Sequence, residues 1–500
     1  MATLWGIRCR RAVQSCRRLV LTTAAGFAGV LAGCSDSAPV APPAARAALT
    51  ALPAAPRYVI ELAAGQAPSS ALTAQIRADG GRIVFSHAPT GIVIVAGLSA
   101  KSAGALRLRA GVQAVVADVY RMRVTDPPFT RMQVRSIRPS AVHPRSFTPG
   151  GGADPRNAQF FSGQWDMTVV QADSAWQITS QGAGVKVFIL DTGVDTAQID
   201  LVGRVNTALS TSFAFATDSS TQPLPFSHDV FSHGTFVSSL IATNSLGIAA
   251  VAPQAQLVMV RVLDDNGSGS LSAIFEGILY AADNGADVIN MSFGGYFSRT
   301  SADDMSAADF YQRLVDYAFQ RGILLVAAAG NESVNLNTAT SPSGSYVDSL
   351  NAPAGLHHIL SVGATGPIDQ ANFDDIADYS NFGNDGVAVF APGGNLSDTL
   401  PSDTADMLFD QVIGACSSAT VSLCPGVEDA YLAGSGTSFA SPMAAGEAAV
   451  VQGQTASVVG QALETCIATT ATEVTGKRPD PKYGFGRINV LSAVTSKSCK

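Results

Sequence analysis

The stretch that decides the fold lies at residues 185–193, where the sequence reads VKVFILDTG. Its apolar run is typical of a strand that is buried on both faces of a sheet. Further short apolar runs, separated by helical stretches, occur at 257–262, 288–292, 323–329, 359–362 and 387–390. Strands that alternate with helices predict an α/β fold, here a doubly wound, mostly parallel sheet with helices on both faces.

Asp191 ends the first of these runs. Functional side chains of open parallel sheets collect at the carboxyl ends of the strands, so Asp191 is a candidate catalytic residue. Asp-Thr-Gly also occurs in aspartic proteases, but that chemistry needs two carboxylates that share a proton. The sequence has no second Asp-Thr-Gly or Asp-Ser-Gly. The remaining alternative is an Asp that merely caps a turn.

Two further motifs carry residues suited to nucleophilic catalysis. His233 lies in Ser-His-Gly-Thr, before a helical pattern rich in small residues at 236–242. Histidine is the commonest general base near neutral pH, although a lone His is usually structural. Ser438 lies in GSGTSFASPMAAG at 434–446, where glycines allow a sharp turn into a helix. A serine there could be a nucleophile if a base lies nearby, or simply an N-cap.

Asn331 follows the apolar run at 323–329 and a glycine. A side-chain amide in that place can donate a hydrogen bond to an oxyanion, although an Asn after Gly is also an ordinary loop residue. In the chain order Asp191, His233, Asn331, Ser438, the four motifs resemble the subtilisin-like serine protease (subtilase) family. More segments resemble family landmarks in family order, at 251–253, 290–295, 379–383, 391–393 and 483–486.

The resemblance covers about 165–493 and implies a serine endopeptidase that acts on proteins or peptides. It implies that Ser438 is the nucleophile, His233 the general base and Asp191 the residue that orients His233. Asn331 and the Ser438 backbone N–H would bind the oxyanion. The family's second histidine, three residues after the first, is Phe236 here. It is not a triad member, so activity is not put in doubt.

The resemblance also implies binding residues. An extended substrate would pair with two edge segments, formed by Gly267, Ser268, Gly269 and by Ser292, Phe293, Gly294. Leu271 and Phe293 would line an apolar subsite, unless both belong to the core. A structural Ca²⁺ is expected, with ligands from Asp200, Asn244, Ala242, Leu246 and Ile248. Asp and Asn in loops more often only form turns. No cofactor is expected for catalysis.

The N-terminus predicts export. Residues 1–33 contain no acidic residue. Five arginines lie within the first 18 residues and an apolar run follows them at 19–32, as in a signal peptide. Leu-Ala-Gly-Cys at 31–34 resembles a lipoprotein processing site and predicts lipidation of Cys34, unless this is an ordinary signal peptide with a chance cysteine. The protein is therefore expected in a bacterial cell envelope, where the lipid would anchor it in the outer membrane before processing. The processed enzyme could then be released from the cell.

Four further regions are predicted. Residues 34–57 are an Ala- and Pro-rich tether. Residues 58–123 have the strand and helix order β-α-β-β-α-β of a small ferredoxin-like domain, which resembles the family's inhibitory, folding-assisting prodomain. Residues 124–158 are a linker with the processing site, and 159–496 form the peptidase domain. Cleavage in the linker would separate the enzyme from its own anchor.

The net charge and the cysteine content restrict the binding partners and the disulfides that can be expected. The net charge is −8, or about −13 without the five N-terminal arginines, which argues against nucleic acid as a partner. Disulfides are expected in an exported protein, and loop closure favours the local pairs Cys416–Cys424 and Cys466–Cys499 among three pairings. A monomer is expected. The alternatives are a catalytically silent scaffold of this family and a structural envelope lipoprotein.

Overall fold

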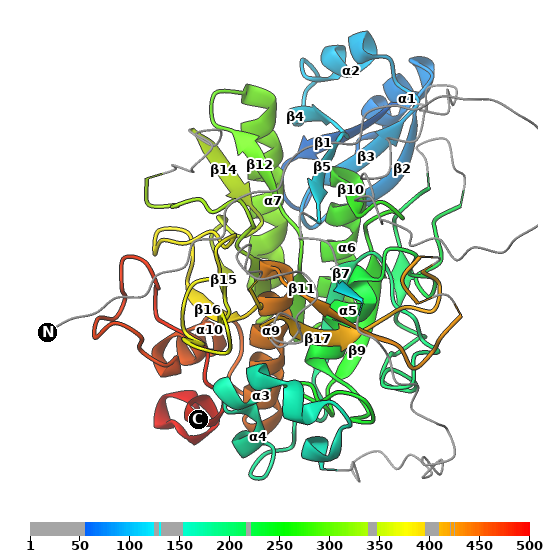
Figure 1. Ribbon diagram of the computed structural model, residues 1–500. Helices are drawn as coiled ribbons and strands as arrows, with labels where there is room; N and C mark the ends of the chain where they lie inside the picture. Colours follow the sequence, from blue (N-terminus) through cyan, green and yellow to red (C-terminus); the bar gives the residue numbers. More distant parts are fainter. Residues whose placement is uncertain are drawn as a thin grey trace, which may run out of the picture. The chain divides into compact units, whose positions relative to one another are not determined.

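The structure is a computed structural model that describes residues 56–124, 130–131, 154–216, 222–338, 348–395, 410–420, 422–424 and 426–500. The predicted signal peptide, Cys34 and nearly all of the tether lie outside these residues, as does most of the linker. Figure 1 shows the order of the elements along the chain.

The centre of the molecule is a seven-stranded sheet in the order β16-β15-β13-β11-β7-β9-β8. All its strand pairs are parallel. The strands are β7 Lys186–Asp191, β8 Thr211–Ser212, β9 Gln256–Arg261, β11 Val288–Met291, β13 Leu324–Ala328, β15 Ile359–Thr365 and β16 Val389–Pro392. Each of the six apolar runs in the sequence contributes one strand, so the predicted parallel α/β fold is confirmed.

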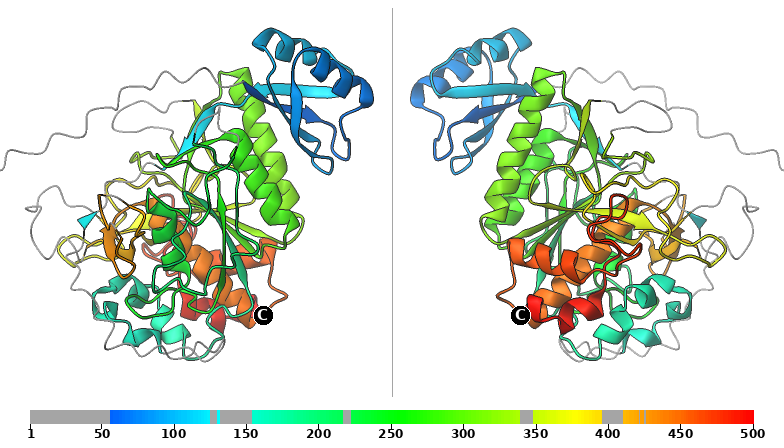
Figure 2. Two further views of the ribbon diagram at one scale, coloured as in Figure 1. Left: turned by 90° about the vertical axis from the view of Figure 1, so that its right-hand side faces the viewer. Right: turned by 90° about the vertical axis from the view of Figure 1, so that its left-hand side faces the viewer.

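Successive side chains of a strand point to opposite faces, and β7 shows the consequence. Val187 and Ile189 pack into a core with the helices α5 His233–Ile241 and α9 Thr437–Gln454. Phe188 and Leu190 pack into a second core with α6 Leu271–Asp283 and α7 Ala302–Phe319. In the side views of Figure 2, α7 (green) and α9 (orange) lie on different sides of the sheet.

Helix α9 is buried along nearly its whole length. Every residue from 437 to 452 is buried, which agrees with a helix that is apolar or small on all sides. Next to it in the same core lie α3 Trp165–Val169, α4 Ala172–Ala175, α10 Gly460–Thr470 and α11 Val490–Thr495. Single 3-10 turns occur at η2 Pro155–Asn157, η3 Phe161–Gly163 and η4 Lys497–Cys499.

The N-terminal part forms a separate four-stranded sheet of order β2-β3-β1-β4. Its paired strands are antiparallel and its helices follow the first and third strands. We call this part the N-terminal α+β module: β1 Arg57–Leu62, α1 Ser70–Ala78, β2 Arg82–His87, β3 Ile92–Ala96, α2 Ala100–Leu106 and β4 Val112–Ala117. The β-α-β-β-α-β order is the one expected from the sequence.

Three small sheets surround the main one. They pair β10 Ser268–Ser270 with β5 Tyr120–Arg123, β12 Gly295–Ser298 with β14 Ser349–Ala352, and β17 Val412–Ala415 with β18 Tyr431–Gly434 and β6 Thr130–Arg131. Both preferred disulfides are present, Cys416–Cys424 and Cys466–Cys499.

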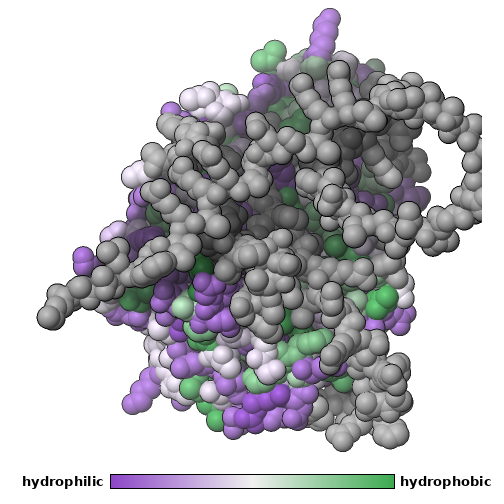
Figure 3. Space-filling model, viewed as in Figure 1, coloured by the Kyte–Doolittle hydropathy of each residue, from purple (hydrophilic) through white to green (hydrophobic). Residues whose placement is uncertain are grey.

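The surface in Figure 3 is a mixture of hydrophilic and hydrophobic residues where it is coloured. Large apolar side chains that reach the solvent, such as Leu108 and Ile178, are scattered over different elements. Within the described ranges, none of the helices combines the length and the apolar character needed to cross a membrane.

Candidate active site

Asp191 and His233 come from neighbouring elements on the carboxyl side of the sheet. Asp191 is the last residue of β7, and His233 is the first residue of α5. The distance from Asp191 Oδ1 to His233 Nδ1 is 2.8 Å, and both side chains are fully buried. The same Oδ1 accepts the backbone N–H of Thr192 at 2.7 Å. A buried carboxylate in this position holds the imidazole in one orientation and favours a proton on Nδ1.

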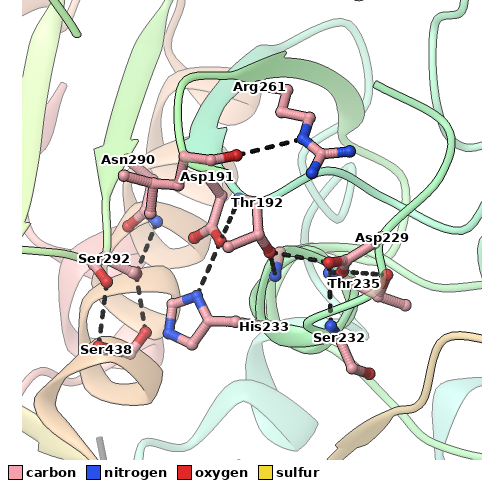
Figure 4. A network of polar contacts seen from close by, with 12 residues as sticks. Asp191, Thr192, Asp229, Ser232, His233, Thr235, Arg261, Asn290, Ser292 and Ser438 are labelled. Atoms are coloured by element: carbon pink, nitrogen blue, oxygen red, sulfur yellow. Dashed lines mark hydrogen bonds and ion pairs between the residues drawn. The ribbon is translucent and has the colours of Figure 1, made fainter. Parts of the chain in front are cut away.

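Ser438 is the second residue of α9, and its side chain lies beside the His233 ring (Figure 4). Ser438 Oγ donates to the backbone oxygen of Ser292 at 3.0 Å, and Ser292 Oγ donates to the backbone oxygen of Ser438 at 2.8 Å. This reciprocal pair ties the start of α9 to the segment that follows β11. Asn290 Nδ2 supports it by donating to Ser292 Oγ at 2.9 Å.

Asn331 follows β13 and reaches across to the start of α9. Its Oδ1 accepts the backbone N–H of Thr437 at 2.9 Å and the Thr437 hydroxyl at 2.8 Å. The amide oxygen is therefore engaged by donors at the start of α9. Asn331 and Ser438 line one small pocket. The sequence-predicted residues Asp191, His233, Ser438 and Asn331 therefore lie in one site.

The pocket next to Ser438 includes residues that the sequence reasoning missed. Its walls come from the segment after β11, from the end of β13 and from β14. Glu332 Oε2 accepts the hydroxyl of Tyr296 at 2.7 Å and Nδ2 of Asn381 at 2.8 Å. Asn351 Nδ2 donates to the backbone oxygen of Ala329 at 2.7 Å. Polar side chains in loops give no signal in the sequence of which pocket they will line.

The two predicted substrate edges lie on either side of the chain's own strand β5. Gly269 pairs with Met122 in an antiparallel ladder, and Val124 N donates to Gly267 O at 2.9 Å. On the other side, Arg123 and Gly294 exchange backbone hydrogen bonds at 3.0 and 3.2 Å. An extended peptide segment therefore lies between both edges, in the manner that the sequence predicts for a substrate.

Leu271 and Phe293 are buried at 0% and 2% exposure. Both belong to the apolar core that also contains Met122 of β5. The interpretation as core residues is confirmed, and the apolar subsite stays a prediction.

The residues expected to bind calcium lie together, but donors of this chain occupy their oxygens. The buried carboxylate of Asp200 accepts the backbone N–H groups of Leu246, Gly247 and Ile248 at 2.7 to 3.0 Å, and the Tyr431 hydroxyl at 2.7 Å. A Ca²⁺ site needs six to eight oxygens that face the ion, whereas here N–H and O–H groups face Asp200.

The other expected ligands are engaged in the same way. Asn244 Oδ1 accepts Nε of Arg204 at 2.9 Å, which brings a guanidinium to the place where a cation would be needed. The carbonyl of Leu246 accepts Gln159 N at 3.0 Å, and the carbonyl of Ile248 accepts Thr243 Oγ1 at 3.0 Å. With Asp200, Asn244, Leu246 and Ile248 so arranged, the loop that begins at Ala242 does not fit a calcium ion.

The comparisons with known proteins agree with this architecture. The model of the Subtilase family matches residues 182–486. Thermitase of Thermoactinomyces vulgaris is 33% identical over 68% of this chain and 99% of its own length. The thermophilic serine proteinase of Bacillus sp. (strain AK1) is 34% identical over 68% of this chain and 69% of its own length.

Solved structures share the fold at lower identity. The epidermin leader peptide processing serine protease of Staphylococcus aureus has a TM-score of 0.68 at 19% identity, covering 88% of this chain and 98% of that one. Fervidolysin of Fervidobacterium pennivorans has a TM-score of 0.64 at 22% identity, covering 88% and 61%. Fold and relatives together define a subtilisin-type serine peptidase. The chain belongs to the subtilase family.

Because donors of this chain hold the carboxylate of Asp200, we expect that the thermal stability of the protein does not depend on calcium bound at this loop. In a Ser438→Ala chain, which prevents self-digestion, the thermal midpoint in EDTA should lie within about 2 °C of the midpoint in calcium. Asp200→Asn should lower the midpoint by several degrees in both solutions, because its NH₂ group would face N–H donors. A large drop in EDTA that is absent in Asp200→Asn would instead establish a calcium site.

Proposed function

We propose that this chain is a secreted serine endopeptidase, which hydrolyses peptide bonds of proteins through an acyl-enzyme on Ser438 and matures by removing its N-terminal module. The observation that carries the proposal is the Asp191–His233 contact at 2.8 Å, with Ser438 beside the imidazole. Membership of the subtilase family supports it.

The chemistry follows from the positions of these groups. His233 accepts the Ser438 hydroxyl proton while Ser438 Oγ attacks the carbonyl carbon of a peptide bond. Asn331 and the Ser438 backbone N–H stabilise the oxygen that becomes negative. As the C–N bond breaks, His233 returns the proton to the leaving amine. Water then attacks the acyl-enzyme by the same route, and Asp191 stabilises the charged imidazole throughout.

The N-terminal α+β module would act as an inhibitory prodomain. Strand β5, which follows the module, lies between Gly269 and Gly294, where a substrate is expected. Further contacts link the module to the α7 side: Arg313 Nη1 donates to Leu62 O at 2.9 Å and Arg313 pairs with Glu61. A segment that fills the groove blocks other peptides until it is cut and released.

The site of cleavage can be counted from the pairing of Arg123 with Gly294. Ser292, two residues before Gly294, contacts Ser438. In an antiparallel pairing the residue two positions after Arg123 is the one expected to react with Ser438, which predicts a cut after Thr125. Thr125 itself lies outside the described residues.

Export and anchoring remain part of the proposal and rest on the sequence alone. The signal peptide at 1–33 and lipidation of Cys34 would place the precursor at the cell envelope. Cleavage after the module would leave the anchor with the prodomain and release the peptidase. Mature peptidase that stays in the membrane fraction without bound prodomain would contradict this release.

The test of the proposal is the intact mass of purified residues 35–500 after incubation, beside the same chain with Ser438→Ala. We expect only the unmodified chain to split, with a new N-terminus at Asp126. If neither chain splits, self-processing is wrong, and the silent scaffold of this family becomes the better interpretation. If both split alike, Ser438 is not the nucleophile of the cut.

A further inference from the structure

Asp229 lies four residues before His233 and is fully buried, although it is not one of the triad residues. Its Oδ1 accepts the Thr192 hydroxyl at 2.9 Å and the backbone N–H of Ser232 at 2.9 Å. Its Oδ2 accepts the backbone N–H of Thr235 at 2.8 Å and the Thr235 hydroxyl at 2.7 Å. Figure 4 shows this carboxylate at the start of α5. Both of its oxygens thus meet two donors each.

The contacts of Asp229 bracket the Asp191–His233 pair. Thr192 directly follows Asp191, while Ser232 directly precedes His233. Thr192 Oγ1 also accepts the backbone N–H of Gly234 at 2.9 Å. The end of β7 and the first turn of α5 are therefore joined through Thr192 and Asp229, in addition to the bond between the catalytic side chains.

The backbone at Ser232 explains why such a clamp is needed. Ser232 has φ +71°, in the left-handed region that favours glycine, and such a conformation persists only where its surroundings hold it. The N–H bond to Asp229 holds Ser232, and Ser417 N donates to Ser232 Oγ at 2.9 Å. Relaxation of Ser232 would turn the first residue of α5, which is His233.

The loop that leads to Asp229 is itself anchored. Arg261, at the end of β9, is fully buried and donates through Nη1 to the carbonyls of Pro225 at 3.0 Å and His228 at 2.7 Å. Its Nη2 pairs with Asp265 at 2.5 Å. Asp229 therefore belongs to a rigid loop rather than to a free turn.

We propose that Asp229 is a positioning residue for the catalytic triad, which fixes the orientation of His233 and adds a second negative charge that favours its protonated form. The inference rests on the proposed function. The proposed role differs from the roles of the triad residues and of the groove edges, because Asp229 would act on the reaction only through His233.

Opposing effects act on the charge of Asp229. Burial raises the pKa of Asp229 and the charge of Asp191 adds to the rise, while the bonds from Thr235 and Thr192 lower it. Donors on both oxygens suit an ionised carboxylate. Asp191 on β7 contacts His233 directly, Arg261 on β9 is the strand neighbour of Asp191, and the Phe439 ring of α9 lies 5.8 Å from the imidazole between centroids. The backbone N–H of Asp195 donates to the Thr235 hydroxyl at 3.0 Å.

The first test compares pH profiles of kcat/KM. Asp229→Asn should lower kcat about tenfold or more, leave KM within about twofold, and move the acid limb down by at least about 0.5 pH unit, because one negative charge near His233 is lost. The control is Asp410→Asn, the same exchange at a buried aspartate that accepts from Asp369 N and Gln370 N in another loop. Its acid limb should stay in place.

A second pair of variants tests the clamp without altering the charge. Thr192→Val has the same shape but loses the bonds to Asp229 and Gly234, and should lower kcat about tenfold with KM little changed. Thr192→Ser keeps the hydroxyl and should recover most of the activity. Equal activity of the valine and serine variants would contradict the clamp.

The deciding measurement does not depend on turnover. In the Ser438→Ala chain, NMR titration of the imidazole gives the pKa of His233, with His233→Gln to assign the signal. Asp229→Asn should lower that pKa by at least about 0.5 unit. An unchanged pKa overturns the positioning role, even if the protein proves not to be a peptidase. Inactive wild-type enzyme with a shifted pKa would instead overturn only the proposed function.

Discussion

Replacing Ser438 by alanine should reduce kcat on peptide substrates by about 10⁶-fold, with binding of the substrate nearly unchanged. The size is taken from subtilisin, where loss of the nucleophilic serine has an effect of about that order. The reason is that alanine cannot form the acyl intermediate, while Asn331 and the groove remain. Ser438 is buried among small residues, so the loss of one oxygen should not disturb α9.

The measurement is a burst and steady-state assay on a peptide ester or amide, after an added protease, later inactivated, has removed the N-terminal module from both proteins. The control is Ser457→Ala, an exposed serine just after α9, which should keep wild-type activity. Activity of Ser438→Ala within tenfold of wild type would mean that the nucleophile lies elsewhere, and the Asp191–His233 pair would need another partner.

The largest effect on stability is expected at Glu447, in the middle of α9. Glu447 is fully buried among alanines, and neither carboxyl oxygen has a hydrogen-bond partner of normal geometry among the described residues. Burial raises its pKa to about 8, which the nearby backbone of Asn489 opposes only in part. The folded protein therefore holds this carboxyl in its neutral form at pH 7.

The direction of the pH dependence follows from the raised pKa. An unfolded glutamate titrates near pH 4.3, so between about pH 4.5 and 8 the folded state binds a proton that the unfolded state has lost. Stability from this group is complete below the unfolded pKa and falls as the pH rises toward about 8. The total loss is of the order of 5 kcal/mol.

Glu447→Gln removes this dependence because an amide stays neutral. We expect the variant to match the wild type near pH 4 and to be more stable by several kcal/mol at pH 9, measured by guanidinium unfolding in the Ser438→Ala background. The matched control is Glu473→Gln at an exposed position, whose difference from wild type should stay flat with pH. A flat difference for Glu447→Gln would show that its carboxylate is solvated.

Much of the fold could be predicted from local sequence. Apolar runs such as 185–190 and 288–292 became strands because a buried parallel strand needs several consecutive apolar residues. The elements of the N-terminal α+β module could be predicted in the same way, because turns that contain glycine separate its strands and helices. These signals depend only on neighbours along the chain.

The triad residues were predicted from the resemblance of their motifs, in chain order, to the subtilase family, because each motif alone also fits a turn, a structural histidine or an N-cap. Asp191 ends a strand, His233 begins a helix of small residues, and Ser438 follows glycines at the start of another. The resemblance implied that the three groups share one site, and the structure shows the 2.8 Å contact between Asp191 and His233 with Ser438 beside the imidazole.

Other features depended on contacts between distant residues. Tyr431, which is 231 positions after Asp200 in the sequence, donates its hydroxyl to the Asp200 carboxylate. Together with the backbone N–H groups of the loop, this donor occupies a carboxylate that the sequence predicts to bind calcium. In the sequence, nothing distinguishes Asp229 from other loop aspartates. Its contacts with the end of β7 and the start of α5 are seen only in the tertiary structure. Local patterns therefore determined the elements and the catalytic residue types, whereas the register of packed elements decided which donors meet which acceptors.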